Sequence, residues 1–115
     1  TWEVKLRPGV RFHDGTPFEA EDLAWTYARI PTVTNSPALF TAATRTITAV
    51  EVKDPTTVIL RTREPNPLLP FDLASPVILS RRIHGAAGPS PSTSEFNSGR
   101  LAIGTGPYRL ASFAH

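Results

Sequence analysis

Twelve prolines divide this chain of 115 residues into short segments. They are about twice as frequent as in an average protein, where proline is roughly 5% of residues. Proline has no backbone N–H and a fixed φ, so it ends helices and is kept out of central strands. The spacing therefore predicts many short helices and strands joined by turns. A hydrophobic content of 40% is enough for one packed core in a single module.

Composition excludes several kinds of site. Cysteine is absent, which rules out disulfides, thiolate catalysis and cysteine-type zinc sites. The net charge is +2, and the basic residues are spread out, with Arg81-Arg82 as the one adjacent pair. A nucleic-acid surface needs a concentrated basic face with stacking aromatics, so no nucleic-acid partner is expected.

The ends of the sequence indicate a piece of a longer protein. The chain starts with "TWEV", which is already a strand pattern and has no initiator methionine. Its last ten residues, "GPYRLASFAH", predict a strand that starts at Tyr108 and stops at His115. No apolar run approaches the roughly 20 residues that span a bilayer.

The stretch "RPGVRFHDGTPFEAEDL", residues 7–23, predicts two turns and a helix start. Pro8-Gly9 suits the centre of a type II turn, and Asp14-Gly15 suits a tight loop with a positive φ at the glycine. Apolar residues alternate on both sides of the first turn, which predicts a β-hairpin of residues 1–6 and 10–12 with one buried face. The alternating positions are Trp2, Val4, Leu6, Val10 and Phe12.

A helix of about eleven residues is expected from Ala20, because apolar residues recur at helical spacing until Pro31. The apolar positions are Leu23, Ala24, Tyr27 and Ile30. Asp22 follows Glu19 by three residues, as in a capping box, and acidic residues in a first turn favour the helix dipole.

The same carboxylates, together with His13-Asp14, are the densest group of possible metal ligands or acid–base residues. Glu21 and Asp22 are consecutive on the helix and point about 100° apart, so they cannot converge on one ion. We therefore interpret the group as a helix start and predict no metal site. The other histidines, His84 and His115, are expected in a loop and at the chain end.

The rest of the chain predicts short elements. Asn35-Ser36-Pro37 is a cap followed by proline, which indicates a short helix to about Thr44. Residues 44–62 predict a second hairpin around Asp54–Thr57, with buried positions Ile47, Val50, Val52, Val58 and Leu60. Asn66-Pro67 precedes a short or kinked helix. Val77–Leu79 fits a buried strand, and residues 85–99 form the one Gly, Ser and Pro-rich stretch.

No catalytic motif emerges. "GTG" at 104–106 is not a phosphate-binding loop, because Pro107 has no N–H to offer and a strand, not a helix, is expected next. There is no Gly-x-Ser-x-Gly elbow. From the residues alone the chain is an α+β module, not an enzyme, with no cofactor expected.

The order of four motifs resembles the family 5 solute-binding proteins, the extracytoplasmic receptors of ABC importers for dipeptides, oligopeptides, nickel and related ligands. The resemblance covers nearly the whole chain, and the first and last motifs are the most specific. The motifs are "TWEVKLRPGVRFHDGTPFEAEDLAWTYARI", "ITAVEVKDPTTVILRT", "EPNPLLPFDLASPVILSRR" and "AIGTGPYRL".

The resemblance implies a fold and a domain organisation. Hairpins and short helices would form the additional domain of a type II periplasmic-binding-protein-like fold. Residues 1–83 would be its core, 84–100 a loop, and 101–115 a strand leading back toward the first lobe. The motif residues implied to be structural are Pro8, Gly9, Asp14, Gly15, Asp22, Gly104, Gly106, Pro107 and Tyr108.

The resemblance also implies a function and partners. The parent would be a non-enzymatic receptor outside the cytoplasmic membrane, in the periplasm or as a lipoprotein. It would capture a peptide or similar solute with its remaining lobes and pass it to ABC permease and ATPase subunits. Asn35 and Phe40 are the implied cleft-facing residues, although a helix cap and a core aromatic also fit them. The alternative function is a stand-alone protein-interaction module that binds no solute.

Overall fold

The computed structural model describes residues 1–32, 44–74, 76–86 and 98–112. Helices and strands are mixed, which confirms the α+β expectation. The elements in chain order are β1 (Trp2–Lys5), α1 (Ala20–Arg29), the 3-10 turn η1 (Ile30–Thr32), β2 (Ile47–Asp54), β3 (Thr57–Thr62), α3 (Leu69–Asp72) and α4 (Arg81–Ala86).

The three strands form an antiparallel sheet in the order β1-β3-β2. β2 and β3 are the predicted second hairpin. Its turn is held by Asp54, whose carboxylate accepts the Thr56 backbone N–H at 2.9 Å and the Thr56 hydroxyl at 3.0 Å. Such a side-chain-to-backbone bond two residues on is typical of aspartate in turns.

The predicted first hairpin is wrong. β1 pairs with β3, so that Val4 lies opposite Val58, and residues 10–12 do not pair with β1. Pro8-Gly9 turns the chain away from the sheet, with Gly9 at φ 76°. Period-2 alternation shows which face of a strand is buried, but it does not identify the neighbouring strand.

A tighter hairpin follows instead, at residues 12–16. The Phe12 N–H donates to the Thr16 carbonyl at 2.8 Å, and the Gly15 N–H donates to the Phe12 carbonyl at 2.9 Å. Gly15 has φ 88°, the positive value that the sequence predicted for it. The flanking residues Arg11 and Pro17 form an isolated bridge.

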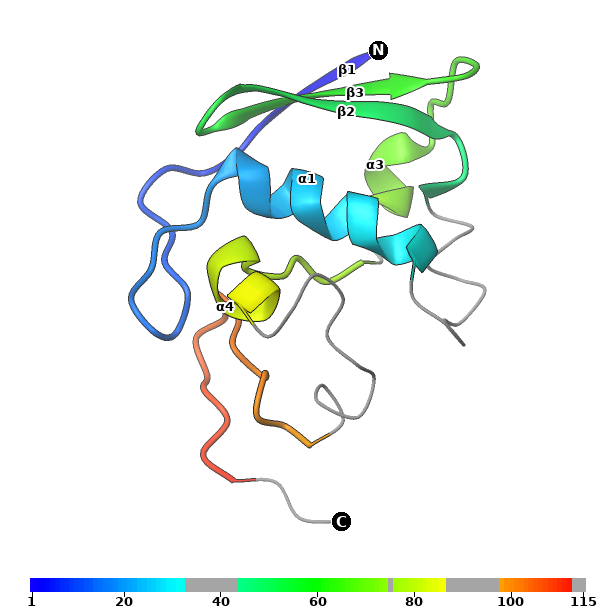
Figure 1. Cartoon of the computed structure of the whole chain (residues 1–115). Coiled ribbons are helices and arrows are strands. Elements are labelled where there is room, and N and C mark those ends of the chain that lie inside the picture. Colours follow the sequence, from blue (N-terminus) through cyan, green and yellow to red (C-terminus); the bar gives the residue numbers. More distant parts are fainter. Residues whose placement is uncertain (33–43, 75, 87–97, 113–115) are drawn as a thin grey trace.

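Helix α1 lies between the sheet on one side and α4 on the other (Figure 1). Its Leu23 and Tyr27 belong to the core with Val58 and Leu60 of β3. Burying such side chains contributes about 1.5–3 kcal/mol each. The full core cluster is Ala20, Leu23, Tyr27, Ile30, Val58, Leu60 and Leu69.

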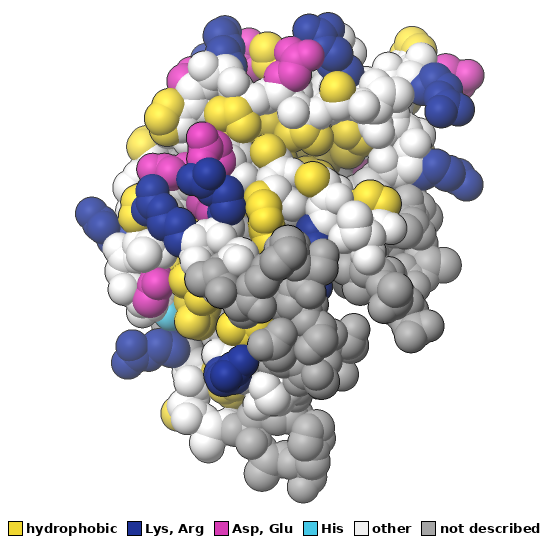
Figure 2. Space-filling model, in the orientation of Figure 1, with side chains coloured by type: hydrophobic (Ala, Val, Ile, Leu, Met, Phe, Trp, Pro, Cys, Tyr) yellow, Lys and Arg dark blue, Asp and Glu magenta, His cyan; other side chains and the backbone are white. Residues whose placement is uncertain are grey.

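The sheet face turned away from α1 is charged (Figure 2). Arg61 makes a two-pronged contact with Glu51 at 2.7 and 3.2 Å, and Lys53 lies 3.5 Å from Glu3. Exposed ion pairs of this kind add little stability. They do mark this face as solvent-facing.

Two residues predicted to be buried, Val52 and Val77, are exposed in the structure. Val52 is 40% exposed, although its cross-strand partner Val58 is fully buried. Val52 lies near the hairpin end of edge strand β2, where no further strand covers its other side. Val77 is 74% exposed, and residues 77–79 form no strand.

The C-terminal third also differs from expectation. His84 is not in a loop: it is fully buried in α4, a helix that the sequence did not predict. Residues 101–112 contain no strand, because a strand requires a paired neighbour and none of the described segments pairs with them. The helix expected after Pro37 lies outside the described residues.

Helix α3 is short, as predicted. The Asn66 side-chain oxygen accepts the Leu68 N–H at 3.1 Å, and the Asn66 carbonyl accepts the Leu69 N–H at 3.2 Å. Pro70 lies in the first turn, where an N–H has no helical acceptor, so it does not interrupt the helix.

The positive φ of Gly15 gives a test of the 12–16 hairpin. We expect Gly15→Ala to lower the free energy of unfolding by about 1–2 kcal/mol, the cost of placing a Cβ in the left-handed region. Gly106→Ala is the matched control, because Gly106 has no positive φ and a Cβ there meets no atom within 4 Å. Urea unfolding of both variants measures the difference, and equal stabilities would contradict the assigned turn.

Candidate functional site

The first and last sequence motifs lie against each other, joined by His13. The His13 backbone N–H donates to the Gly104 carbonyl at 2.9 Å. The His13 ring bonds to the same turn: Nδ1 accepts the Gly104 N–H at 3.2 Å, and Nε2 donates to the Gly106 carbonyl at 2.9 Å. Three hydrogen bonds thus connect residues about 91 positions apart.

The Asp14 carboxylate makes its hydrogen bonds within its own loop. Its carboxylate accepts the Thr16 hydroxyl at 2.6 Å and the Thr16 backbone N–H at 3.0 Å. These hydrogen bonds hold the pKa of Asp14 below its ordinary value, with a smaller contribution from the charge of Arg82. Asp14 therefore stabilises the turn as an anion.

Asp22 joins the starts of two helices. It is buried, and its Oδ2 accepts the Glu19 N–H at 2.8 Å, which is the predicted cap of α1. Its Oδ1 accepts the N–H of Arg81, the first residue of α4, at 2.8 Å. The second bond, across 59 positions, has no local sequence signal.

Further contacts fix α4 on α1. Thr26 accepts the Leu79 N–H at 2.9 Å through its hydroxyl, which in turn donates to the Asp22 carbonyl at 2.7 Å. The Trp25 ring lies 3.8 Å from where a Cβ of Gly85 would be, which is an ordinary van der Waals distance, so the two helices pack against each other at this point. At the surface, Arg81 pairs with Glu21 and Arg82 with Glu19.

His84 continues this connection toward the C-terminal residues. Its Nδ1 accepts the Ser80 N–H at 2.9 Å, and its Nε2 donates to the Leu101 carbonyl at 2.9 Å. His13 and His84 therefore both attach residues 101–106 to the module through backbone groups. The sequence analysis missed both roles, because nothing in the local pattern shows which carbonyl a histidine reaches.

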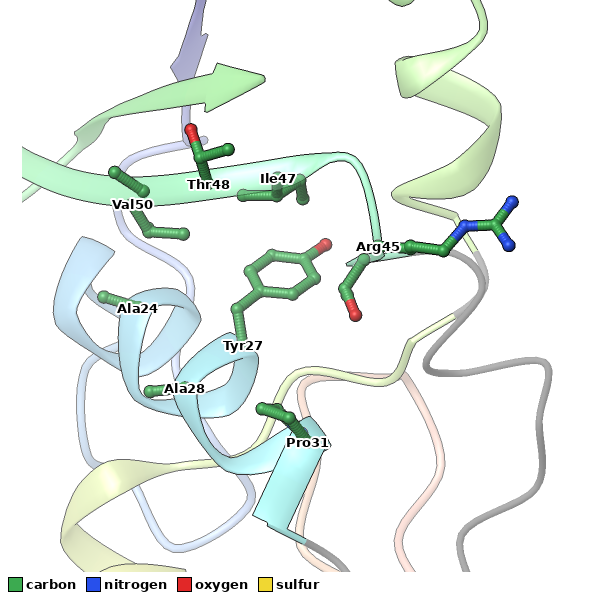
Figure 3. Close-up of a pocket in the computed structure, with 10 residues that line it drawn as sticks. Ala24, Tyr27, Ala28, Pro31, Arg45, Ile47, Thr48 and Val50 are labelled. Carbon is green, nitrogen blue, oxygen red and sulfur yellow. The ribbon is translucent and has the colours of Figure 1, made fainter. Parts of the chain in front are cut away.

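A pocket of about 710 Å³ opens between α1 and β2 (Figure 3). The Tyr27 ring extends from α1 toward β2 and is one of the lining side chains, and most of the others are small or apolar. The lining residues are Ala24, Tyr27, Ala28, Pro31, Thr44, Arg45, Ile47, Thr48, Ala49 and Val50. Among the described residues, Arg45 is the one charged side chain that lines it.

The predicted site residues fall into two groups. Asn35 and Phe40 lie outside the described residues, so their cleft-facing role stays a prediction. Gly104 and Gly106 form the turn that His13 contacts, followed by Pro107 and a Tyr108 that is 89% exposed.

The part of the chain that the structure describes holds no group of three or more His, Asp or Glu residues arranged to bind a metal ion. Both His13 ring nitrogens bond to backbone groups and not to carboxylates. None of the described helices is long and apolar enough to cross a membrane.

The role of Asp22 can be tested by truncation. We expect Asp22→Ala to lower the free energy of unfolding by about 2–3 kcal/mol, because it leaves the N–H groups of Glu19 and Arg81 without their acceptor. Glu21→Ala, which removes an exposed partner of Arg81, is the control and should cost less than about 1 kcal/mol. Urea unfolding measures both, and similar losses would show that Asp22 is not the connecting group.

The buried side chain of Tyr27 predicts that stability falls at alkaline pH. Burial raises the pKa of Tyr27 from 10.0 to about 12. The neutral form is therefore favoured on folding: its stabilisation is complete below pH 10.0 and is lost as the pH rises from 10.0 toward about 12. The free energy of unfolding should fall over this range in the unaltered chain but not in Tyr27→Phe. Tyr108→Phe, at an exposed ring, should behave like the unaltered chain.

The known proteins that are similar to this chain include one curated relative and two solved structures with bound ligands. A Brucella ovis protein, provisionally named an ABC transporter peptide-binding protein, is 26% identical over 110 residues, which are 96% of this chain and 20% of that protein. NikZ from Campylobacter jejuni, solved with Ni(L-His), matches with a TM-score of 0.81 and 26% identity over 97% of this chain and 22% of its own. AgaA from A. tumefaciens R10, solved with agropinic acid, matches with a TM-score of 0.76 and 25% identity. The match covers 98% of this chain and 22% of AgaA.

The chain thus spans about one fifth of the length of these relatives. The family model described as "Bacterial extracellular solute-binding proteins, family 5 Middle" matches residues 1–115, the whole sequence. Its match agrees with the resemblance of the four motifs and with the shared fold. The chain belongs to the bacterial extracellular solute-binding proteins of family 5.

Proposed function

We propose that this chain is a scaffold unit of a receptor that captures a small solute outside the cytoplasmic membrane and delivers it to an ABC transporter. The observation that carries the proposal is the family match over all 115 residues. The superposition on NikZ, which covers 97% of this chain, supports it. The family is one of solute-binding proteins, which hold a ligand without transforming it.

The geometry of the described residues fits a scaffold. α1 is fixed by the sheet on one face and by Asp22 and Thr26 contacts to the α4 segment on the other. The 12–16 loop and the 104–106 turn are joined through His13. These interactions hold the unit rigid, and a receptor with two lobes needs such rigid parts to close around a ligand.

The relatives indicate a small solute but differ in which one they are named for or were solved with. One relative is named for peptides, one was solved with Ni(L-His) and one with agropinic acid, yet all share this unit. We infer that the solute is a peptide or a similar small molecule and that other parts of the receptor select it. Asn35 and Phe40 are proposed as the residues of this unit that face the cleft.

The proposed partners are the remaining lobes of the receptor, its solute, and the permease and ATPase subunits of the transporter. A periplasmic or lipoprotein form would suit this role. The 710 Å³ pocket between α1 and β2 is not proposed as the solute site, because we infer that other parts of the receptor select the solute.

The proposal is tested by comparing how residues 1–115 and the protein that contains them bind solutes. The DNA on both sides of this stretch is sequenced, and the product of the whole reading frame is compared with residues 1–115. Both are titrated calorimetrically with a peptide library, Ni(L-His) and agropinic acid. We expect at least one solute to bind the longer product, and none to bind residues 1–115 with micromolar affinity, since a one-sided surface buries too little of a ligand.

A Phe40→Ala variant of the longer product tests the cleft assignment, with Phe71→Ala as the control at a ring that is 76% exposed. Only the first should weaken solute binding. A specific micromolar ligand for residues 1–115 would contradict the scaffold role. A reading frame confined to these residues would contradict the receptor role and favour the interaction-module alternative.

A further inference from the structure

Residues 101–106 are attached to the module by two histidines with unlike surroundings. His13 binds Gly104 and Gly106, and His84 binds Leu101. His84 is fully buried, whereas His13 is only partly buried. A proton from solvent can therefore reach the His13 ring without unfolding, but it cannot reach His84 in this way.

The His13 contact requires a neutral ring. Nδ1 accepts the Gly104 N–H at 3.2 Å, which leaves Nε2 as the protonated nitrogen that donates to the Gly106 carbonyl at 2.9 Å. In the imidazolium form both nitrogens are donors. The added proton on Nδ1 would face the Gly104 N–H, so that one hydrogen bond is replaced by two opposed donors.

His84 tolerates the same change better. Its Nδ1 lies 2.9 Å from the Ser80 nitrogen but also 3.1 Å from the Ser80 carbonyl oxygen. A proton on Nδ1 would deprive the Ser80 N–H of its acceptor, but it would find the Ser80 carbonyl oxygen as an acceptor of its own. The Leu101 contact is made by the other nitrogen, Nε2, which donates in both forms.

The charged groups near His13 do not replace the hydrogen bond that its protonation removes. Hydrogen bonds from Thr16, and more weakly the charge of Arg82 in α4, hold the pKa of Asp14 low, so this carboxylate stays ionised while a histidine takes up its proton. Arg82 itself pairs with Glu19. Residues 101–106, "LAIGTG", carry no titratable side chain.

We propose that His13 is an acid-sensitive attachment: its protonation releases the 104–106 turn from the 12–16 loop, while His84 keeps Leu101 in place. The described residues after the turn, 107–112, make no strand pairing that would hold them otherwise. Acid would therefore free the 104–106 turn and the described residues that follow it from the 12–16 loop. This inference goes beyond solute capture and does not depend on it.

Amide hydrogen exchange in residues 1–115 tests the proposal by NMR. Protection of the Gly104 and Ser80 N–H groups, corrected for intrinsic exchange, is measured against pH, and protonation of each ring is followed by its own Cε1–H shift. We expect protection of Gly104 to fall on the order of tenfold with the protonation of His13, as loss of one hydrogen bond implies. Ser80, which donates to His84, should keep its protection over that range.

His13→Asn supplies the matched control, because its side-chain oxygen can replace Nδ1 as an acceptor but takes up no proton in this range. In this variant protection of Gly104 should not depend on pH. The proposal is overturned if Gly104 stays protected when His13 is protonated, if Gly104 and Ser80 lose protection together, or if the pH dependence persists in His13→Asn. A Gly104 amide that is unprotected even with a neutral His13 would overturn it as well.

Discussion

The arrangement of this module depends on one buried carboxylate. The first backbone N–H groups of a helix have no acceptor within it, and a buried carboxylate is costly without donors. Asp22 meets both needs at once, with one oxygen on the N–H of Glu19 before α1 and the other on the N–H of Arg81 at the start of α4. Thr26, one turn later, repeats the connection through the Leu79 N–H. The α4 segment is thus positioned on α1 by hydrogen bonds from its backbone N–H groups to two side chains of α1.

This construction accounts for the scaffold role that we propose. α1 uses Leu23 and Tyr27 to hold the sheet and Asp22 and Thr26 to hold the α4 segment, so both of its faces are committed to structure. The titratable groups of the opening motif are committed as well: Asp14 to its own turn and His13 to the 104–106 turn. NikZ, solved with Ni(L-His), and AgaA, solved with agropinic acid, share the fold of this unit at 26% and 25% identity, so the same fold accompanies unlike ligands.

Sequence reasoning predicted the features that have local causes. The start and end of α1, the β2–β3 hairpin and the positive φ of Gly15 follow from capping, periodicity and turn chemistry. It failed where the cause is distant: β1 takes β3 as its partner, and α4 has only six residues with a glycine among them. The site residues show the same division, since the Asp22 cap was visible in the sequence and its bond to Arg81 was not.

The pairing of β1 with β3 has a consequence for the order in which the module can form. The first strand emerges from the ribosome more than fifty residues before its partner, because Trp2 pairs with Leu60. Its alternating apolar side chains stay without a neighbour throughout that interval, while the β2–β3 hairpin closes through local contacts as soon as Thr62 is made. β1 is therefore the last of the three strands to find its partner, and its unpaired backbone N–H and C=O groups are the ones that a chaperone would have most reason to shield until β3 is made.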